Sequence, residues 1–104
     1  MKPNRLVVSD AAAADIVEQA DWYSTQADRA LVERWENAVT SAITQVVKNP
    51  NAGAPCNFRP RELRNVRHIA IPGFRKHLLF YTVDLERIFV LRVVHGARDL
   101  EPLL

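Results

Sequence analysis

Histidine and arginine are the residues of this sequence whose chemistry could act on a ligand. His68, His77 and His95 fall in three different segments of strand character, and Arg92 and Arg98 lie on either side of His95. Cleavage of a phosphodiester without a metal ion requires a general base, a general acid and a cation at the phosphate. Imidazole and guanidinium groups meet those needs, so the residue inventory admits this reaction. Three histidines at these spacings do not specify it.

Motifs for other chemistries are absent from the sequence. It has no glycine-rich phosphate loop, no serine–histidine–aspartate ordering and no histidine pair at metal-ligand spacing. Cys56 is the only cysteine, which excludes an internal disulfide and a cysteine-based zinc site. We therefore expect no metal and no cofactor, and we interpret Cys56 as an incidental loop thiol.

The polar residues near the C-terminal end also have structural interpretations. Arg92 lies inside an apolar segment, where an unpaired charge is costly to bury. It is expected to form a salt bridge with Asp99, Glu62 or an acidic helix residue. His95 precedes Gly96 and could simply cap the end of a strand with a hydrogen bond. These interpretations stay open beside the functional ones.

Charge is unevenly distributed along the chain. The net charge of +2 combines −2 from residues 1–50 with +4 from residues 51–104. Between residues 59 and 77 only Glu62 is acidic, and six residues are basic: Arg59, Arg61, Arg64, Arg67, Arg75 and Lys76. Such a surface attracts anionic partners, whether nucleic acid or an acidic protein segment. A merely solvated face is the alternative.

The elements that must position these residues follow from the spacing of apolar side chains. We predict a strand over 5–8, helices over 11–27 and 28–48, and strands over 66–71, 76–83 and 88–95. Ser9 or Asp10 would cap the first helix and Asp28 the second. The connections are short, so the helices should form a hairpin and the last three strands an antiparallel sheet. The fold class is α+β, in the order β-α-α-β-β-β.

The predicted elements have distinct apolar faces. On the strands, side chains alternate, which groups Ile88, Val90, Arg92 and Val94 on one face of the last strand. The apolar stripe of the first helix is Ala13, Ile16, Val17, Ala20 and Tyr23, and that of the second is Leu31, Trp35, Ala38, Ala42 and Val46. Trp35 and Tyr81 are expected in the core. Trp22 lies beside its stripe, and an exposed tryptophan there would indicate a partner surface.

Length and composition indicate one globular domain over residues 1–104. The content of 48% apolar and 25% charged residues is ordinary for such a domain. No apolar run approaches the roughly 20 residues that span a bilayer. The apolar run Leu6–Val8 is too short for a signal peptide. We expect a cytoplasmic protein without membrane contact.

The sequence resembles the ParE branch of the ParE/RelE toxin superfamily. The resemblance lies in "ELRNVRHIAIPGFRKHLLFYTVD" leading into "IFVLRVVHGARDLEPLL", in the helix start "AAADIVEQADWY" and in the "NPNAG" loop. The piece "VLRVVHGARD" is the most specific. The resemblance implies a RelE/ParE-like fold and a toxin of a type II toxin–antitoxin system, associated with growth arrest and plasmid stabilisation. A ParD-like antitoxin would be its partner, and DNA would be contacted only through antitoxin or gyrase.

Two branches of the superfamily imply different activities. ParE toxins inhibit DNA gyrase, whereas RelE relatives cut mRNA in the ribosome with several basic residues and a tyrosine or histidine. By resemblance, Arg98 stands where RelE-like enzymes have a phosphate-binding arginine. Leu104 stands where they have the tyrosine, and Leu78 or His77 where they have an arginine. This favours a non-enzymatic gyrase inhibitor, with a RelE-type endonuclease and a degenerate, harmless toxin as alternatives.

The resemblance also implies two contact surfaces, and we assign no catalytic residue. The expected target-contact residues are Arg98, His95, Arg92, Leu103 and Leu104. Arg92 would mainly order that site. The expected antitoxin-binding residues are Trp22 and the basic residues Arg59, Arg61, Arg64, Arg67, Arg75 and Lys76.

Overall fold

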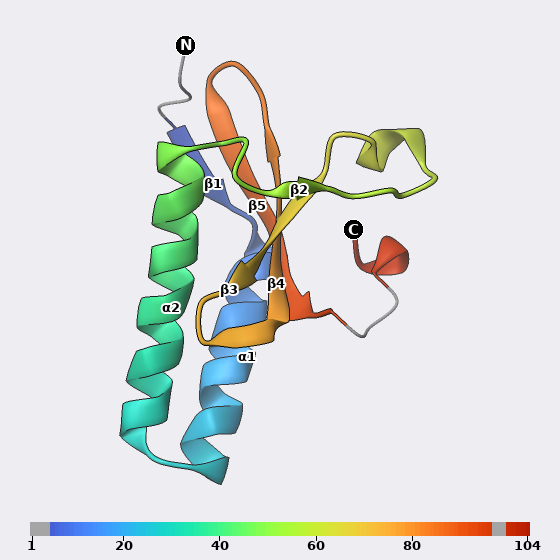
Figure 1. The fold of residues 1–104 in the computed structure, drawn as a ribbon. Coiled ribbons are helices and arrows are strands. Elements are labelled where there is room, and N and C mark those ends of the chain that lie inside the picture. Colours follow the sequence, from blue (N-terminus) through green and yellow to red (C-terminus); the bar gives the residue numbers. More distant parts are fainter. Residues whose placement is uncertain (1–4, 97–99) are drawn as a thin grey trace.

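Two helices cover one face of a five-stranded sheet (Figure 1). The structure is a computed structural model, and it describes residues 5–96 and 100–104, apart from the side chain of Glu101. The helices and strands are β1 (Arg5–Val8), α1 (Asp10–Gln26), α2 (Arg29–Lys48), β2 (Ala54–Pro55), β3 (Arg67–Ile71), β4 (Phe74–Val83) and β5 (Arg87–His95). Short 3-10 turns occupy Arg61–Leu63 and Glu101–Leu103.

The ends of both helices follow from local sequence. The Ser9 hydroxyl accepts a hydrogen bond from Ala12 N at 3.0 Å, and the Asp28 carboxylate accepts one from Leu31 N at 3.1 Å. Both therefore act as N-caps, as predicted. Pro50 cannot continue α2, which ends at Lys48.

The strands are arranged in the order β1-β5-β4-β3-β2. The α+β class and the helical hairpin on the sheet are confirmed, but the sheet is mixed rather than wholly antiparallel. Strand β1 pairs with β5 in parallel, Arg5 opposite Arg87 and Val8 opposite Val90. Tight turns determine strand direction only for neighbours in the sequence, and no turn joins β1 to β5. The two-residue strand β2 is not among the strands predicted from the sequence.

The helix-facing side of the sheet holds the main core. Trp35 and Tyr81 are both fully buried there, as predicted, and the stripe of α2 points inward. The stripe of α1 was predicted wrongly at Ala13 and Val17, which are exposed. Ala12 and Asp15 are buried instead. The charged Asp15 can occupy an inward position because β5 supplies its hydrogen bonds. A prediction based on the spacing of apolar side chains does not include it.

The other face of the sheet carries a second, smaller apolar cluster. Its buried members are Leu63, Val66, Phe80 and Val94. The segment 56–66 and the C-terminal leucines Leu100, Leu103 and Leu104 pack against it. This second face of the sheet is therefore partly covered by chain from its own domain.

A β-bulge interrupts the regular alternation of β5. Phe80 pairs with Arg92 but Tyr81 pairs with Val90, so Leu91 has no partner on β4. Beyond the bulge, Val93 joins the helix-facing core and Val94 joins the opposite cluster. The predicted grouping of Arg92 and Val94 with Val90 on one face is thus wrong. The extra residue at the bulge places the side chains after it on the face opposite to the one that strict alternation predicts.

Candidate functional site

A guanidinium–carboxylate pair joins α1 to β5 just past the bulge. Arg92 Nε and Nη2 each donate to the Asp15 carboxylate at 2.7 Å, and the third nitrogen, Nη1, donates to the Leu103 carbonyl at 3.1 Å. Asp15 also accepts from Val93 N at 3.0 Å. The hydrogen bonds to Asp15 raise the pKa of Arg92, and burial opposes that rise. The predicted salt bridge is confirmed, with the acidic helix residue as the partner.

His77 and His95 face each other beside this pair. They are opposite in the β4–β5 ladder, and their ring centroids are 5.5 Å apart. The His77 ring also meets the edge of Trp35 at 5.1 Å. Burial, and next the neighbouring His95, lower the pKa of His77. The two rings line a depression of about 130 Å³ together with Asp15 and Glu18.

His68 does not join the other two histidines. Its ring packs on Phe80, in the cluster on the opposite face, with centroids 5.9 Å apart. Its Nδ1 lies 3.3 Å from Cys56 Sγ. Burial raises the pKa of the Cys56 thiol, which favours the protonated and weakly nucleophilic form. The possibility that all three histidines converge is therefore excluded.

The C-terminal leucines lie close to the Arg92 pair. Leu103 and Leu104 are half-buried against the second cluster, and the Leu103 carbonyl is held by Arg92. Arg98 and Asp99, which were also expected near this end, lie outside the described residues. Arg92 thus holds the leucine tail against β5, whereas the His95 ring lies against His77, which contacts Trp35 of α2.

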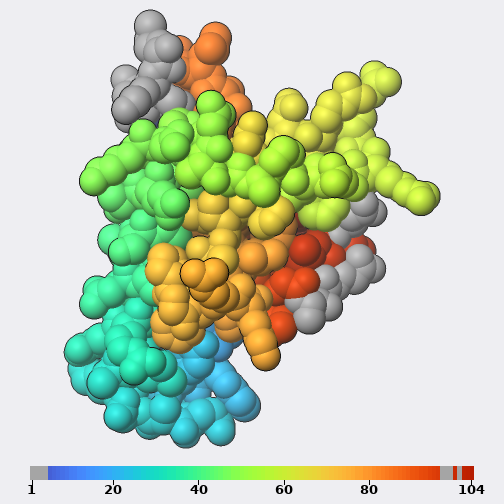
Figure 2. All heavy atoms as spheres, viewed as in Figure 1, coloured from blue at the N-terminus to red at the C-terminus, as the bar shows by residue number. Residues whose placement is uncertain are grey.

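The basic residues lie elsewhere, three of them on the protruding segment between β2 and β3 and the other three on β3 and β4. Figures 1 and 2 show this yellow-green segment standing out from the body of the molecule. Five of the six basic residues are exposed: Arg59, Arg61, Arg64, Arg75 and Lys76. Arg67 is half-buried and donates from Nη1 to the Gly53 carbonyl at 2.7 Å. Trp22 on α1 is 57% exposed.

The chemistry available at the histidine pair depends on whether Arg92 can act as a cation for a ligand. Two imidazoles can exchange protons, but a phosphate would also need a cation. All three nitrogens of Arg92 are engaged by Asp15 and Leu103. Within residues 5–96 and 100–104, no three metal-ligating side chains form a group that could hold an ion. Arg75 and Lys76 line another hollow together with the two rings, so the nearest uncommitted cations come from β4.

Asp15 is the site residue that sequence reasoning missed. Its place near the start of α1 suits the helix dipole, which gives an acidic residue a sufficient reason to be there. The signal that could have identified it is position. Asp15 falls between Ala12 and Gln19 on the inward side, where a charge needs a partner, and Arg92 was the buried arginine in need of one.

Comparisons with known proteins place the chain in a family. None of the helices in the described part of the chain is long and apolar enough to cross a membrane. A search of curated proteins found no match. A solved structure titled "Chromosomal ParDE TA system from P. aeruginosa" has the same fold, with a TM-score of 0.70 and 21% identity over 88% of this chain and 94% of that one. Residues 6–100 match the family described as "ParE toxin of type II toxin-antitoxin system, parDE". The chain therefore belongs to the ParE toxin family of type II toxin–antitoxin systems.

Proposed function

We propose that this toxin inhibits DNA gyrase by binding it, without catalysis, and that a ParD-like antitoxin neutralises it in the cytoplasm. Family membership supports the toxin role. The observation that favours binding over catalysis is the engagement of Arg92. Its guanidinium is held by Asp15 and the Leu103 carbonyl, so its positive charge is already paired with a carboxylate and is less able to neutralise a phosphate beside His77 and His95.

The proposed target-contact surface is the C-terminal edge of the sheet. Arg98, His95, Leu103 and Leu104 would touch the target, and Arg92 would hold the tail in position. The half-buried packing of both leucines supports this, because it gives the tail one defined place without removing it from the surface. The role of Arg98 is supported by the family resemblance.

The proposed antitoxin surface combines Trp22 with the basic residues from Arg59 to Lys76. An amphipathic antitoxin helix would lie beside the α1–α2 hairpin, and an extended segment would pair with a sheet edge. An acidic tail would match the basic segment and speed association. We expect nanomolar or tighter binding, about −12 kcal/mol or more favourable. A toxin that shows no affinity for its neighbouring gene's product would contradict this.

The test compares two activities of the purified toxin. One assay follows gyrase supercoiling and DNA cleavage, and the other follows mRNA cleavage on programmed ribosomes, each with and without antitoxin. Gyrase inhibition with intact mRNA is expected. Arg98→Ala should abolish growth inhibition and leave antitoxin affinity nearly unchanged. If toxicity survives in a folded Arg98→Ala variant, the C-terminal edge is not the toxic surface.

A second function, RelE-type mRNA cleavage, is favoured by one observation. His77 and His95 face each other across β4 and β5 and could serve as acid and base. In that case mRNA would be cut in phase with codons, gyrase would be unaffected, and His95→Gln would abolish cutting. Absence of growth arrest on expression without antitoxin would instead indicate a degenerate toxin that only binds.

A further inference from the structure

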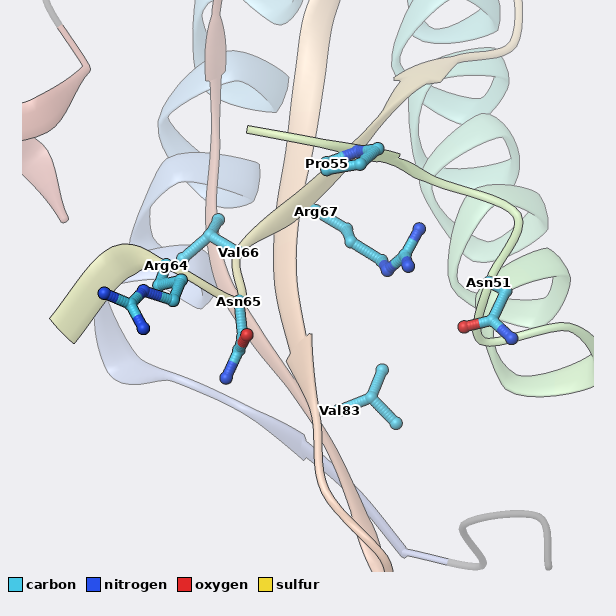
Figure 3. Close-up of a pocket in the computed structure, with 7 residues that line it drawn as sticks. All are labelled: Asn51, Pro55, Arg64, Asn65, Val66, Arg67 and Val83. Carbon is cyan, nitrogen blue, oxygen red and sulfur yellow. The ribbon is translucent and has the colours of Figure 1, made fainter. Parts of the chain in front are cut away.

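A polar hollow lies where the start of β3 meets the loop after α2, away from the histidine pair. It has a volume of about 360 Å³. Its lining residues are Asn51, Pro55, Arg64, Asn65, Val66, Arg67 and Val83. Figure 3 shows the Arg67 guanidinium between Asn65 and Asn51, with Val83 below it, and the Arg64 side chain at the far end of the hollow, extending away from Arg67.

Three hydrogen bonds, one buried and two partly buried, fix the loop that forms one wall of this hollow. The Tyr81 hydroxyl donates to the Pro50 carbonyl at 2.8 Å and accepts from Gly53 N at 2.8 Å. Arg67 Nη1 donates to the Gly53 carbonyl on the same loop. Asn51 and Pro55 are therefore held in place before any ligand arrives, which lowers the ordering cost of binding.

The hollow carries positive charge that nothing in the described structure neutralises. No aspartate or glutamate lines it. Within the described ranges, neither Arg64 nor Arg67 has an ion-pair partner. The carboxamides of Asn51 and Asn65 likewise have no hydrogen bond to described residues. Arg67, Asn51 and Asn65 have unused donors around one space, and Arg64 adds a further cation at its rim, which suits an oxyanion.

The size and the apolar walls narrow the class of ligand. A volume of about 360 Å³ lies in the range of pockets that enclose a whole small molecule. A single carboxylate would leave most of it empty. Pro55 and Val83 add apolar faces beside the arginines. We propose that the hollow binds one nucleotide of a nucleic-acid strand, with its phosphate on Arg67, the neighbouring phosphate of the strand on Arg64, and its base or sugar against Pro55 and Val83.

The surroundings of the hollow fit a strand that continues beyond it. Arg61 is exposed on the protruding segment that leads to Arg64. Successive phosphates of a single strand bind to basic side chains spaced along such a surface. This proposal adds a direct nucleic-acid contact to the toxin, and it holds whether or not gyrase is the target.

The test measures binding of a labelled 12-nucleotide DNA strand, its duplex and the matching RNA strand by fluorescence anisotropy over a range of salt. Arg64→Gln should weaken single-strand binding about tenfold and lower the salt slope by about one, the value for one lost phosphate contact. Arg34→Gln, which removes the same charge from the exposed face of α2, is the matched control and should change binding little. Arg67→Gln also removes the contact with Gly53, so its interpretation requires an unchanged melting temperature.

Two competitors, free dAMP and a poly-glutamate peptide, test whether the hollow binds a single nucleotide, a longer strand or an acidic peptide. Displacement of the strand by free dAMP would support the hollow and show that one nucleotide suffices. Failure of dAMP to compete, with Arg64→Gln still weakening the strand, would also support it and show that neighbouring phosphates contribute. Equal weakening by Arg34→Gln, absence of strand binding, or binding of a poly-glutamate peptide in place of the strand would each overturn the proposal.

Discussion

Asp15 and Arg92 lie 77 positions apart in the sequence and meet through two hydrogen bonds of 2.7 Å. Their side chains are only 8% and 19% exposed. Because Arg92 also holds the Leu103 carbonyl, the pair connects the start of α1 to the C-terminal tail. A change at either residue should therefore be felt both in stability and at the tail.

Replacing Asp15 with asparagine should destabilise the toxin by about 3 kcal/mol, because it leaves Arg92 without its counter-charge in a buried site. The measurement is the urea midpoint of unfolding, with amide hydrogen exchange at residues 100–104 as a second readout. Exchange at the tail should rise, since Arg92 is no longer held in position.

The matched control for that change is Glu33→Gln. Glu33 pairs with Arg29 at 3.3 Å on α2, but both side chains are largely exposed. Such pairs contribute about 0–1 kcal/mol, so the midpoint should hardly move. Equal effects of Asp15→Asn and Glu33→Gln would show that burial of the first pair has no energetic consequence.

Stability should fall as the pH is lowered through the range in which His77 titrates. The folded-state pKa of His77 is lowered by burial and by His95. Below the ordinary histidine pKa of about 6.5 the unfolded chain therefore binds a proton that the folded chain does not. Protonation consequently favours unfolding until the pH reaches the folded pKa. Asp15 and Glu18 of α1 also face this depression and limit the size of the effect.

The check is a series of urea midpoints between pH 5 and 8 for the unaltered toxin and for His77→Phe. The phenylalanine keeps a ring against Trp35 but cannot titrate. Its midpoints should depend less on pH across this range. An identical pH dependence in both proteins would assign the effect to other groups.

Alanine at Gly53 should destabilise the toxin by about 1–3 kcal/mol through steric overlap. A Cβ there would lie 2.5 Å from Tyr81 Oη and 2.9 Å from the His68 carbonyl. Tyr81→Phe alone should also cost about 1–3 kcal/mol, because it leaves the Pro50 carbonyl and Gly53 N unpaired. The two changes together should cost less than their sum, since phenylalanine removes the closest clashing atom.

Gly73→Ala, alone and combined with Tyr81→Phe, is the control for this pair of substitutions. Gly73 has a φ of +79°, and a Cβ there would meet nothing within 4 Å. Its cost, about 1 kcal/mol, should come from backbone strain alone. It should be the same with tyrosine or phenylalanine at position 81. The steric explanation would be contradicted if the stability costs of Gly53→Ala and Tyr81→Phe were additive. It would also be contradicted if those of Gly73→Ala and Tyr81→Phe were not.

The two tryptophans should respond oppositely to alanine. Trp22→Ala should leave stability within about 0.5 kcal/mol, as expected for a surface position. It should weaken antitoxin binding at least tenfold if Trp22 anchors the partner, which corresponds to about 1.4 kcal/mol or more. Trp35→Ala should cost about 3–5 kcal/mol, because Trp35 is fully buried and donates to the Ile16 carbonyl at 3.1 Å. Calorimetry and chemical unfolding measure the two effects. Unchanged antitoxin affinity in Trp22→Ala would remove this residue from the interface.

The sequence predicts the elements of this fold because their signals are local. Apolar spacing marks α2, Ser9 and Asp28 cap the helices, and the Pro72–Gly73 turn separates β3 from β4. The family resemblance then supplied the toxin class, which the residue chemistry alone left open.

The missed features depend on contacts between distant residues. The inward position of Asp15 and the bulge at Leu91 accompany each other, since Asp15 bonds both Arg92 and Val93 N on the bulged strand. Neither feature has a periodic signal of its own. The same is true of the polar hollow, whose residues come from four separate stretches of chain. Spacing within one element cannot show which elements meet.

The parallel pairing of β1 with β5 has a consequence for the timing of synthesis. Arg5 and Arg87 are neighbours in the sheet but lie 82 positions apart in the chain. At about 5–20 residues per second, translation takes on the order of 4–16 seconds to proceed from one to the other. During that interval β1 has no partner and the helix hairpin has no β5 to cover. The nascent chain therefore cannot complete its sheet until β5 has emerged from the ribosome.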